Sequence, residues 1–268
     1  MTAVTQVIAA VTGTDISQSQ LFLMAKRRMA CTLPRAVKYH DTYDIDDVWA
    51  AIDAWPPNDR LDMERLREKV IIFLKLDTMG RNSDVARLFR EDLSLKLTDR
   101  ELLLRFYGAK ERPHAFTDWI SIAACTDRSN LCTVAAVREY LRRTQHRNIS
   151  PQSIRVGRNT LSMRPLILQL GRAAGVSEDL ISNSTKKVLR ESGIPNEFDA
   201  HSTRSATISK AVQLGVNQDR VRLHARISSA DIFRKHYLRI RTGRPIPVQN
   251  PNEMHISDVL RYTYLHRP

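Results

Sequence analysis

Two β-rich runs lie close together in a chain whose other apolar patterns are helical. They are ELLLRFYG at residues 101–108 and FTDWISIA at residues 116–123. The polar stretch between them, AKERPHA, suits a hairpin connection, which would place Lys110 and Arg112 in or beside it. The sequence therefore predicts a mainly α fold with a small antiparallel β-sheet, an α+β class.

Helical spacing is clearest just before these runs. Leu66, Val70, Phe73 and Leu74 recur at helical intervals, and Gly80 is a plausible helix terminator. The other predicted helices cover residues 19–30, 44–55, 82–93, 131–144, 159–174, 177–193, 200–215, 217–225, 229–241 and 258–268.

The apolar content divides the chain into three parts. Residues 1–40 hold too little apolar material for a domain and are expected to form a leading arm. Residues 41–242 form the main domain, and the Pro-containing residues 243–268 form a tail. The length of 268 residues suits one large domain, with or without such appendages.

The charge is basic and unevenly placed. The chain carries 42 Lys+Arg against 29 Asp+Glu, and residues 101–268 alone carry 27 basic and 14 acidic side chains. Arg outnumbers Lys by 32 to 10, and guanidinium binds phosphate in a planar, bidentate way. Nucleic acid is therefore the leading candidate partner, and a solvated basic face without a specific ligand is the alternative.

Other function classes find little support. No stretch approaches the roughly 18 apolar residues of a membrane span, and the N-terminus lacks the basic region of a signal peptide. Cys31, Cys125 and Cys132 show no metal-binding spacing, so we expect no disulfide and no structural metal.

Four segments carry the candidate chemistry. TMGRNSDVARL contains Arg81, FYGAKER contains Lys110, AHSTRSA contains His201 and Arg204, and IFRKHYLR contains Tyr237. A His-x-x-Arg pair alone is uninformative, because about one is expected by chance in so Arg-rich a chain and two occur. In this order and setting, however, the four segments resemble the catalytic domain of the tyrosine recombinase (phage integrase) family, over about Asp41 to Arg241.

The residues of two segments narrow the resemblance to one branch of this family. FDAHSTRSATISKA and SSADIFRKHYLR look most like the eukaryotic mobile-element branch, such as DIRS-like retrotransposons and Cryptons. The resemblance implies an intracellular protein, nuclear if the source is eukaryotic and otherwise cytoplasmic. It also implies double-stranded DNA as the partner and a tetramer on that DNA, with residues 243–268 as a possible protomer-exchange segment.

The implied chemistry is DNA cleavage and rejoining through a 3′-phosphotyrosyl intermediate on Tyr237, without metal or cofactor. Two pre-organised guanidinium groups, Arg81 and Arg204, would stabilise the charge on the phosphate oxygens. Lys110 would protonate the departing 5′ oxygen. His201 would hydrogen-bond the phosphate or accept the phenolic proton, since the ordinary phenol pKa of about 10 leaves tyrosine a weak nucleophile.

Each residue also has a plainer interpretation. Arg81 could complement a helix dipole, Lys110 could be an ordinary exposed hairpin cation with Arg112 as the local alternative, and Tyr237 could be half-buried packing. His201 and Arg204 could be a helix cap and a surface charge.

Two departures from the family pattern stand out. Where the family has a His or Trp nine or ten residues before the nucleophile, this chain has Ser228 and Ile227, and His224 is a possible substitute. Only residues 1–40 precede the match, so they could be a remnant of an N-terminal core-binding domain. A decayed or domesticated protein that binds DNA without cleaving it, and a type IB topoisomerase-like relaxer, are therefore the alternative functions.

Overall fold

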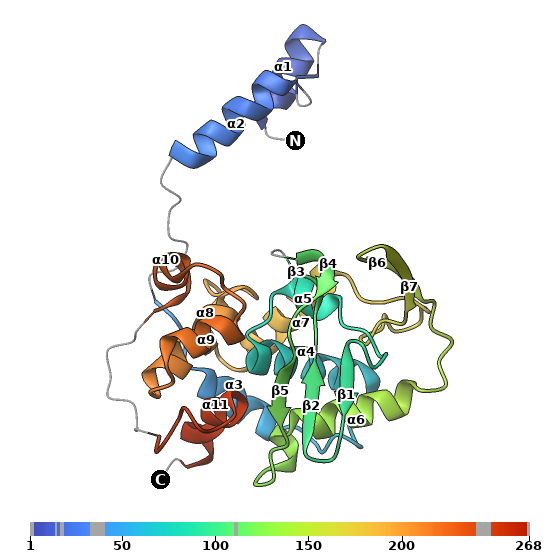
Figure 1. Cartoon of the computed structure of the whole chain (residues 1–268), viewed down its shortest axis with the longest axis vertical. Helices are drawn as coiled ribbons and strands as arrows, with labels where there is room; N and C mark the ends of the chain where they lie inside the picture. The colour runs from blue at the N-terminus through green and yellow to red at the C-terminus, as the bar shows by residue number, and fades with distance from the viewer. Residues whose placement is uncertain are drawn as a thin grey trace. The chain divides into compact units, whose positions relative to one another are not determined.

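The computed structural model describes residues 3–13, 15–16, 19–32, 41–109, 112–239 and 248–266. The chain divides into two compact units, Met1–Lys38 and Tyr39–Pro268 (Figure 1). The first unit contains helices α1 (Ala3–Thr12) and α2 (Gln20–Thr32). The second unit holds the hydrophobic core and every candidate site residue that the structure describes.

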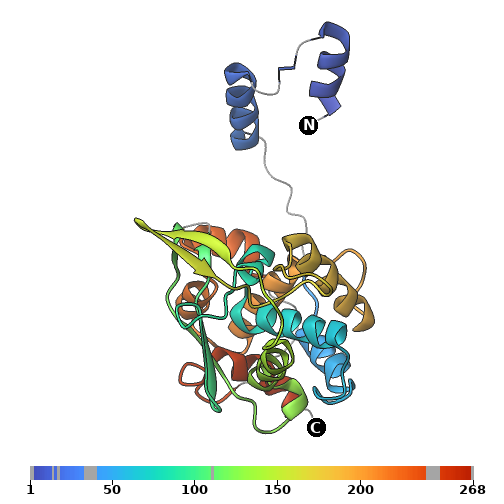
Figure 2. The same ribbon diagram turned by 90° about the vertical axis from the view of Figure 1, so that its right-hand side faces the viewer.

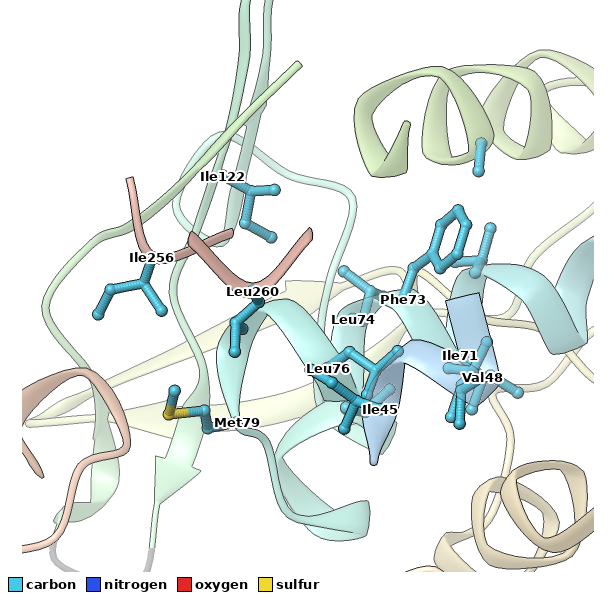
Figure 3. Packing of buried hydrophobic residues seen from close by; sticks show 14 of the residues in the cluster. Ile45, Val48, Ile71, Phe73, Leu74, Leu76, Met79, Ile122, Ile256 and Leu260 are labelled. Carbon is cyan, nitrogen blue, oxygen red and sulfur yellow. The ribbon is translucent and has the colours of Figure 1, made fainter. Parts of the chain in front are cut away.

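Helix α4 (Met63–Thr78) is the centre of the second unit. Its first turn is capped by Asp62, whose carboxylate accepts a hydrogen bond from the Arg65 amide at 2.7 Å. Helices α6 (Thr133–Thr144), α7 (Glu178–Glu191), α8 (Ser202–Gln213) and α11 (Ile256–Leu265) pack on it. Because it is surrounded, α4 is buried on nearly all sides, and Figure 3 shows its apolar side chains meeting those of α3 (Ile45–Asp53) and α11.

The end of α4 is a tight turn that leads directly into the candidate site. Met79 adopts φ 51, the left-handed conformation that ends many helices. A Cβ on Gly80 would lie 2.8 Å from the Thr78 Oγ1 atom, so only glycine fits there without rearrangement. Helix α5 (Asn82–Ala86) begins immediately afterwards.

The predicted hairpin is present and is longer than a single pair of strands. Strands β1 (Leu95–Leu97), β2 (Glu101–Leu104) and β5 (Ile120–Ala123) form an antiparallel sheet in the order β1-β2-β5. Beyond β2 and β5 the same two segments pair again as β3 (Tyr107–Ala109) and β4 (Arg112–Phe116). The prediction of a mainly α fold with a small antiparallel sheet is therefore confirmed.

One predicted helix is wrong. Residues 159–174 begin with strand β7 (Asn159–Met163), which pairs with β6 (Gln152–Val156) in a second hairpin. Gly157, at φ 59, allows the tight turn between them. Pro165 lacks an amide donor and disfavours helix at the preceding residue, so the buried Leu166–Leu168 segment that follows is irregular.

Two further helices are shorter than their sequence patterns indicate. The predicted helix 82–93 ends at Ala86, because Phe89 instead forms a β-bridge with Pro165. The predicted helix 229–241 is one short turn, α10 (Ala230–Ile232), followed by the π-helical turn η2 (Phe233–Tyr237). Helix α9 (Gln218–His224) precedes them. None of the described helices is long and apolar enough to cross a membrane.

Candidate active site

Three chain segments that are distant in sequence meet at the end of α4. Arg81 is the residue before α5, His201 and Arg204 lie at the start of α8, and Tyr237 ends the η2 turn. The Cζ atom of Arg204 lies 5.1 Å from the centre of the Tyr237 ring. The ring centres of His201 and Tyr237 are 6.1 Å apart. The structure thus brings His201, Arg204 and Tyr237 together, and Asp84 connects the backbone of Arg81 to Arg204.

Arg204 is a buried guanidinium held by backbone carbonyls. It is 1% exposed, and it donates hydrogen bonds to the carbonyl of Met79 at 2.6 Å and to that of Ala225. Burial and the nearby charges of Arg226 and Arg81 lower the pKa of Arg204 to about 9, so the group is still charged at neutral pH. Its interpretation as an ordinary surface charge is wrong.

Asp84 partly offsets the positive charge of Arg81, Arg204 and Arg226. Its Oδ2 atom accepts the Arg81 amide hydrogen at 3.0 Å and lies 3.0 Å from Arg226 Nη2 and 4.0 Å from Arg204 Nη1. The Arg226 guanidinium also covers the ring of Phe106 at 4.3 Å. Although burial opposes ionisation, the pKa of Asp84 is lowered, because Arg226 and the other cations hold it ionised.

Asp84 and Arg226 were not found from the sequence. Asp84 lies three residues after Arg81, a spacing that reads equally well as an ordinary acidic first helical turn. Arg226 adopts φ 55, a conformation that favours glycine and that no sequence pattern marked.

Lys75 is a third functional candidate that sequence reasoning missed. Its side chain is 1% exposed, and its Nζ atom donates to the Asn82 side chain and, at 2.7 Å, to the Ala200 carbonyl. Burial lowers the pKa of Lys75 to about 7, and Arg204 adds to the effect. Lys75 therefore ties the residue after Arg81 to the residue before His201. A lysine on the buried face of an apolar helix is the sequence signal that could have identified it.

His201 lies at the start of α8 and reaches solvent. The Asp199 side chain accepts its backbone amide hydrogen at 2.8 Å, which fixes the turn. Desolvation and the charges of Arg204 and Lys75 lower the pKa of His201. The imidazole is therefore neutral at neutral pH and has a nitrogen lone pair that can accept a proton.

Lys110 lies outside the described residues, together with Glu111. The residues on either side are described, because Ala109 ends β3 and Arg112 begins β4 in register with it. The described residues on either side pair with each other, Ala109 with Arg112, and the role of Lys110 stays a prediction.

Neither residue at the His or Trp position of the family pattern carries an imidazole or an indole. Ile227 is 4% exposed and belongs to the hydrophobic core, whereas Ser228 is exposed. The Nε2 atom of His224 lies 2.7 Å from the Asp77 carbonyl, so it is engaged inside the fold. Ser228 and His224 line an open cavity of about 590 Å³ between β5, α9 and the start of α11.

His224 gives a prediction for stability. Burial lowers its pKa to about 4 from an ordinary 6.5, so the folded protein binds this proton less well than the unfolded chain does. The free energy of unfolding should therefore rise between about pH 4 and 6.5, by on the order of 3 kcal/mol from this group. Denaturant unfolding of the His224→Asn variant should show a flatter rise over this interval. The exposed His146→Asn serves as control, and an equal slope in both variants would contradict the assignment.

Comparison with known proteins rests on structure, since no protein-family model and no curated protein sequence matches this chain. XerH site-specific recombinase in a pre-cleavage complex with difH substrate matches with a TM-score of 0.54 at 12% identity, over 79% of this chain and 53% of that one. Its post-cleavage complex matches at 0.52 and 12%, over 72% and 48%. XerA recombinase matches at 0.52 and 13%, over 90% and 68%.

These similarities establish the fold. The second unit has the α+β fold of tyrosine recombinase catalytic domains, although the sequences share few residues. The chain spans about half the length of the XerH recombinase that it matches.

Proposed function

We propose that this protein is a tyrosine recombinase that cleaves and rejoins DNA strands through Tyr237. The observation that carries the proposal is the meeting of His201, Arg204 and Tyr237 from two separate segments. Asp84 connects the segment of Arg81 to this cluster, because it accepts the Arg81 amide hydrogen and lies near Arg204. A fold shared with DNA-bound recombinases and the basic charge of the chain add support.

The proposed reaction is a transesterification at one DNA phosphate. The Tyr237 phenolic oxygen attacks phosphorus and forms a new P–O bond, while the phosphorus stays attached to the 3′ oxygen of the DNA. The bond from phosphorus to the 5′ oxygen breaks. His201 accepts the phenolic proton, and Lys110 gives a proton to the departing 5′ oxygen. Rejoining reverses these steps, so the bond energy is conserved.

Arg81 and Arg204 are proposed to stabilise the charge that builds on the non-bridging phosphate oxygens. The carbonyl contacts of Arg204 fix its guanidinium before DNA arrives, and the charged Asp84 aligns the segments that carry both arginines. Donors fixed in this way do not have to reorganise during the reaction, which is the main source of their catalytic effect. The scheme uses only side chains of the protein.

The direct test is covalent capture. The protein is incubated with a nicked suicide duplex, whose short 5′ fragment dissociates after cleavage and prevents religation. We expect a protein–DNA adduct that survives denaturation, with the attached nucleotide mapped to the peptide containing Tyr237. Absence of an adduct despite DNA binding would reject the catalytic proposal.

A second candidate is a DNA-binding protein without cleavage activity. It is favoured by Ile227, a buried aliphatic side chain where the family pattern has a donor to the phosphate. DNA binding without any adduct selects this candidate. Relaxation of supercoiled plasmid by a monomer, without strand exchange, would instead select a type IB topoisomerase-like activity.

We further propose the finer assignments that the sequence motifs suggest: the DIRS-like or Crypton-like branch, and a tetramer on DNA that exchanges residues 243–268 between protomers. Helix α11 makes polar contacts with α4 and α3. Arg261 pairs with Asp77 at 2.5 Å, and the Tyr264 hydroxyl donates to the Asp53 carboxylate at 2.9 Å. Terminal repeats or a reverse transcriptase gene beside the reading frame would test the branch. Mass measurement of the DNA complex would test the tetramer.

Lys75→Met provides a prediction about positioning. The variant removes the donor to the Asn82 side chain and the Ala200 carbonyl. The contact that links the segments of Arg81 and His201 is then lost. We expect the rate of adduct formation at saturating DNA to fall roughly 10- to 100-fold, the effect of displacing reacting groups by about 1 Å. Lys69→Met is the matched control. It removes another buried lysine of α4, bonded to Asn130 away from the site, and should leave the rate unchanged.

A further inference from the structure

One stretch of the chain is basic without any acidic residue. Residues 140–177 contain seven arginines and no Asp or Glu. Three of these arginines are ion-paired to carboxylates outside the stretch: Arg142 and Arg143 to Glu139, and Arg164 to Glu91. Arg155 and Arg158, at the turn of the β6-β7 hairpin, are exposed, and within the described part of the chain neither has an acidic partner.

The two faces of this hairpin differ in chemistry. The cross-strand pairs Ser153–Ser162 and Arg155–Thr160 are exposed, and each of these four side chains can donate hydrogen bonds. The alternate positions face inward, where Ile154 and Met163 are buried with Phe89 and Phe116. Because strand side chains alternate between faces, the exposed face has hydroxyl and guanidinium groups and no carboxylate.

The hairpin is also fixed against β3 and β4, the two strands that flank residues 110 and 111 in the sequence. The Tyr107 hydroxyl of β3 donates to the Arg155 carbonyl at 2.7 Å and accepts from the Arg155 amide at 3.1 Å. The Gly157 amide donates to the His114 carbonyl of β4 at 3.3 Å. Figures 1 and 2 show β3-β4 and β6-β7 together at one end of the second unit.

We propose that the β6-β7 hairpin is a second DNA-binding element, which contacts the backbone of the duplex beside the scissile phosphate through Arg155 and Arg158. The partner follows from charge complementarity. Both guanidinium groups are exposed without an acidic partner in the described part of the chain, and the one hydrogen bond that the Arg155 side chain makes there, from Nε to the Gly157 carbonyl at 3.3 Å, leaves its terminal nitrogens available to phosphate. The inference rests on the proposed function only in its choice of DNA as partner. The contact would not depend on the base sequence of the DNA, and it is separate from the chemistry at Tyr237.

The test is the salt dependence of duplex binding, measured by fluorescence anisotropy between roughly 50 and 200 mM salt. For Arg155→Ala/Arg158→Ala we expect a slope of log K against log salt that is shallower by about 1 for each lost phosphate contact. Binding near 0.1 M salt should weaken by roughly 10- to 100-fold. Adduct formation at saturating DNA should stay as in the parent protein.

Arg60→Ala/Arg100→Ala is the control with the same change in net charge. Both residues are exposed. Arg60 precedes α4, about 24 Å of helix from Arg81, and Arg100 lies in the β1-β2 turn at the far end of the ribbon from residue 110. This variant should keep the parent slope.

The outcomes separate the hairpin from the chemistry. Equal slopes for the two double variants, with adduct formation intact, overturn the hairpin assignment and leave the recombinase proposal standing. Equal slopes with loss of oligomers on DNA also overturn it, and identify a protein–protein contact instead. A shallower slope for Arg155→Ala/Arg158→Ala, together with no adduct from the parent protein, supports DNA binding by the hairpin. It rejects only the proposed cleavage chemistry.

Discussion

Tyr237→Phe is expected to abolish the covalent adduct with DNA and to leave DNA binding intact. Phenylalanine keeps the aromatic ring, whose centre lies 5.1 Å from the Arg204 Cζ atom. The fold and the charged side chains around Asp84 should therefore be unaffected. It removes only the oxygen that would form the phosphotyrosyl bond. Loss of a nucleophile typically lowers the rate by a factor of about 10³ or more, below detection in an adduct assay.

The measurement compares adduct yield and anisotropy for the same protein samples. Tyr262→Phe is the matched control, since this tyrosine lies on α11 and stacks on His266 at 4.3 Å. It should form adduct at the parent level. An undiminished adduct from Tyr237→Phe would remove Tyr237 as the nucleophile and redirect attention to the α11 tyrosines.

The elements with strong local signals were predictable, and those shaped by distant contacts were not. Helix α4 follows its apolar spacing from an Asp cap to Gly80, and the β2-β5 hairpin follows its two β-rich runs. The β6-β7 hairpin was missed because its apolar residues suit either a helix or a strand until Phe116 and Phe89 are placed beside them. Such pairing is a tertiary effect that overrides local propensity.

The candidate site shows the same difference between local signals and distant contacts. Arg81, His201, Arg204 and Tyr237 stand in motifs whose order resembles a known family, so the sequence pointed to them directly. Asp84, Arg226 and Lys75 act through contacts between segments, and their types and spacings are unremarkable in one dimension. Only the folded chain shows that Asp84 faces Arg226 and that Lys75 joins the turns of Arg81 and His201.

Arg204→Met is expected to have the second large effect, on rate and stability together. The variant leaves the Met79 and Ala225 carbonyls without their donor in a buried place, and an unpaired buried group costs about 1–3 kcal/mol. We therefore expect a free energy of unfolding lower by about 2–5 kcal/mol, measured by urea denaturation. Adduct formation should fall by about 10³ or more, because the variant removes the proposed guanidinium donors to the phosphate.

Arg204→Lys separates the two effects. Lysine keeps the charge and can replace one of the two hydrogen bonds to carbonyls, so much of the stability should return. The planar guanidinium that we propose to bind phosphate is not restored. We expect adduct formation to remain at least 100-fold below the parent level while the protein is folded. Recovery of the rate along with the stability would mean that Arg204 serves only to hold Met79 and Ala225 together. In that case Arg81 would be the only predicted arginine left to stabilise the phosphate, and Arg226, which shares Asp84 with it, would be the next residue to replace.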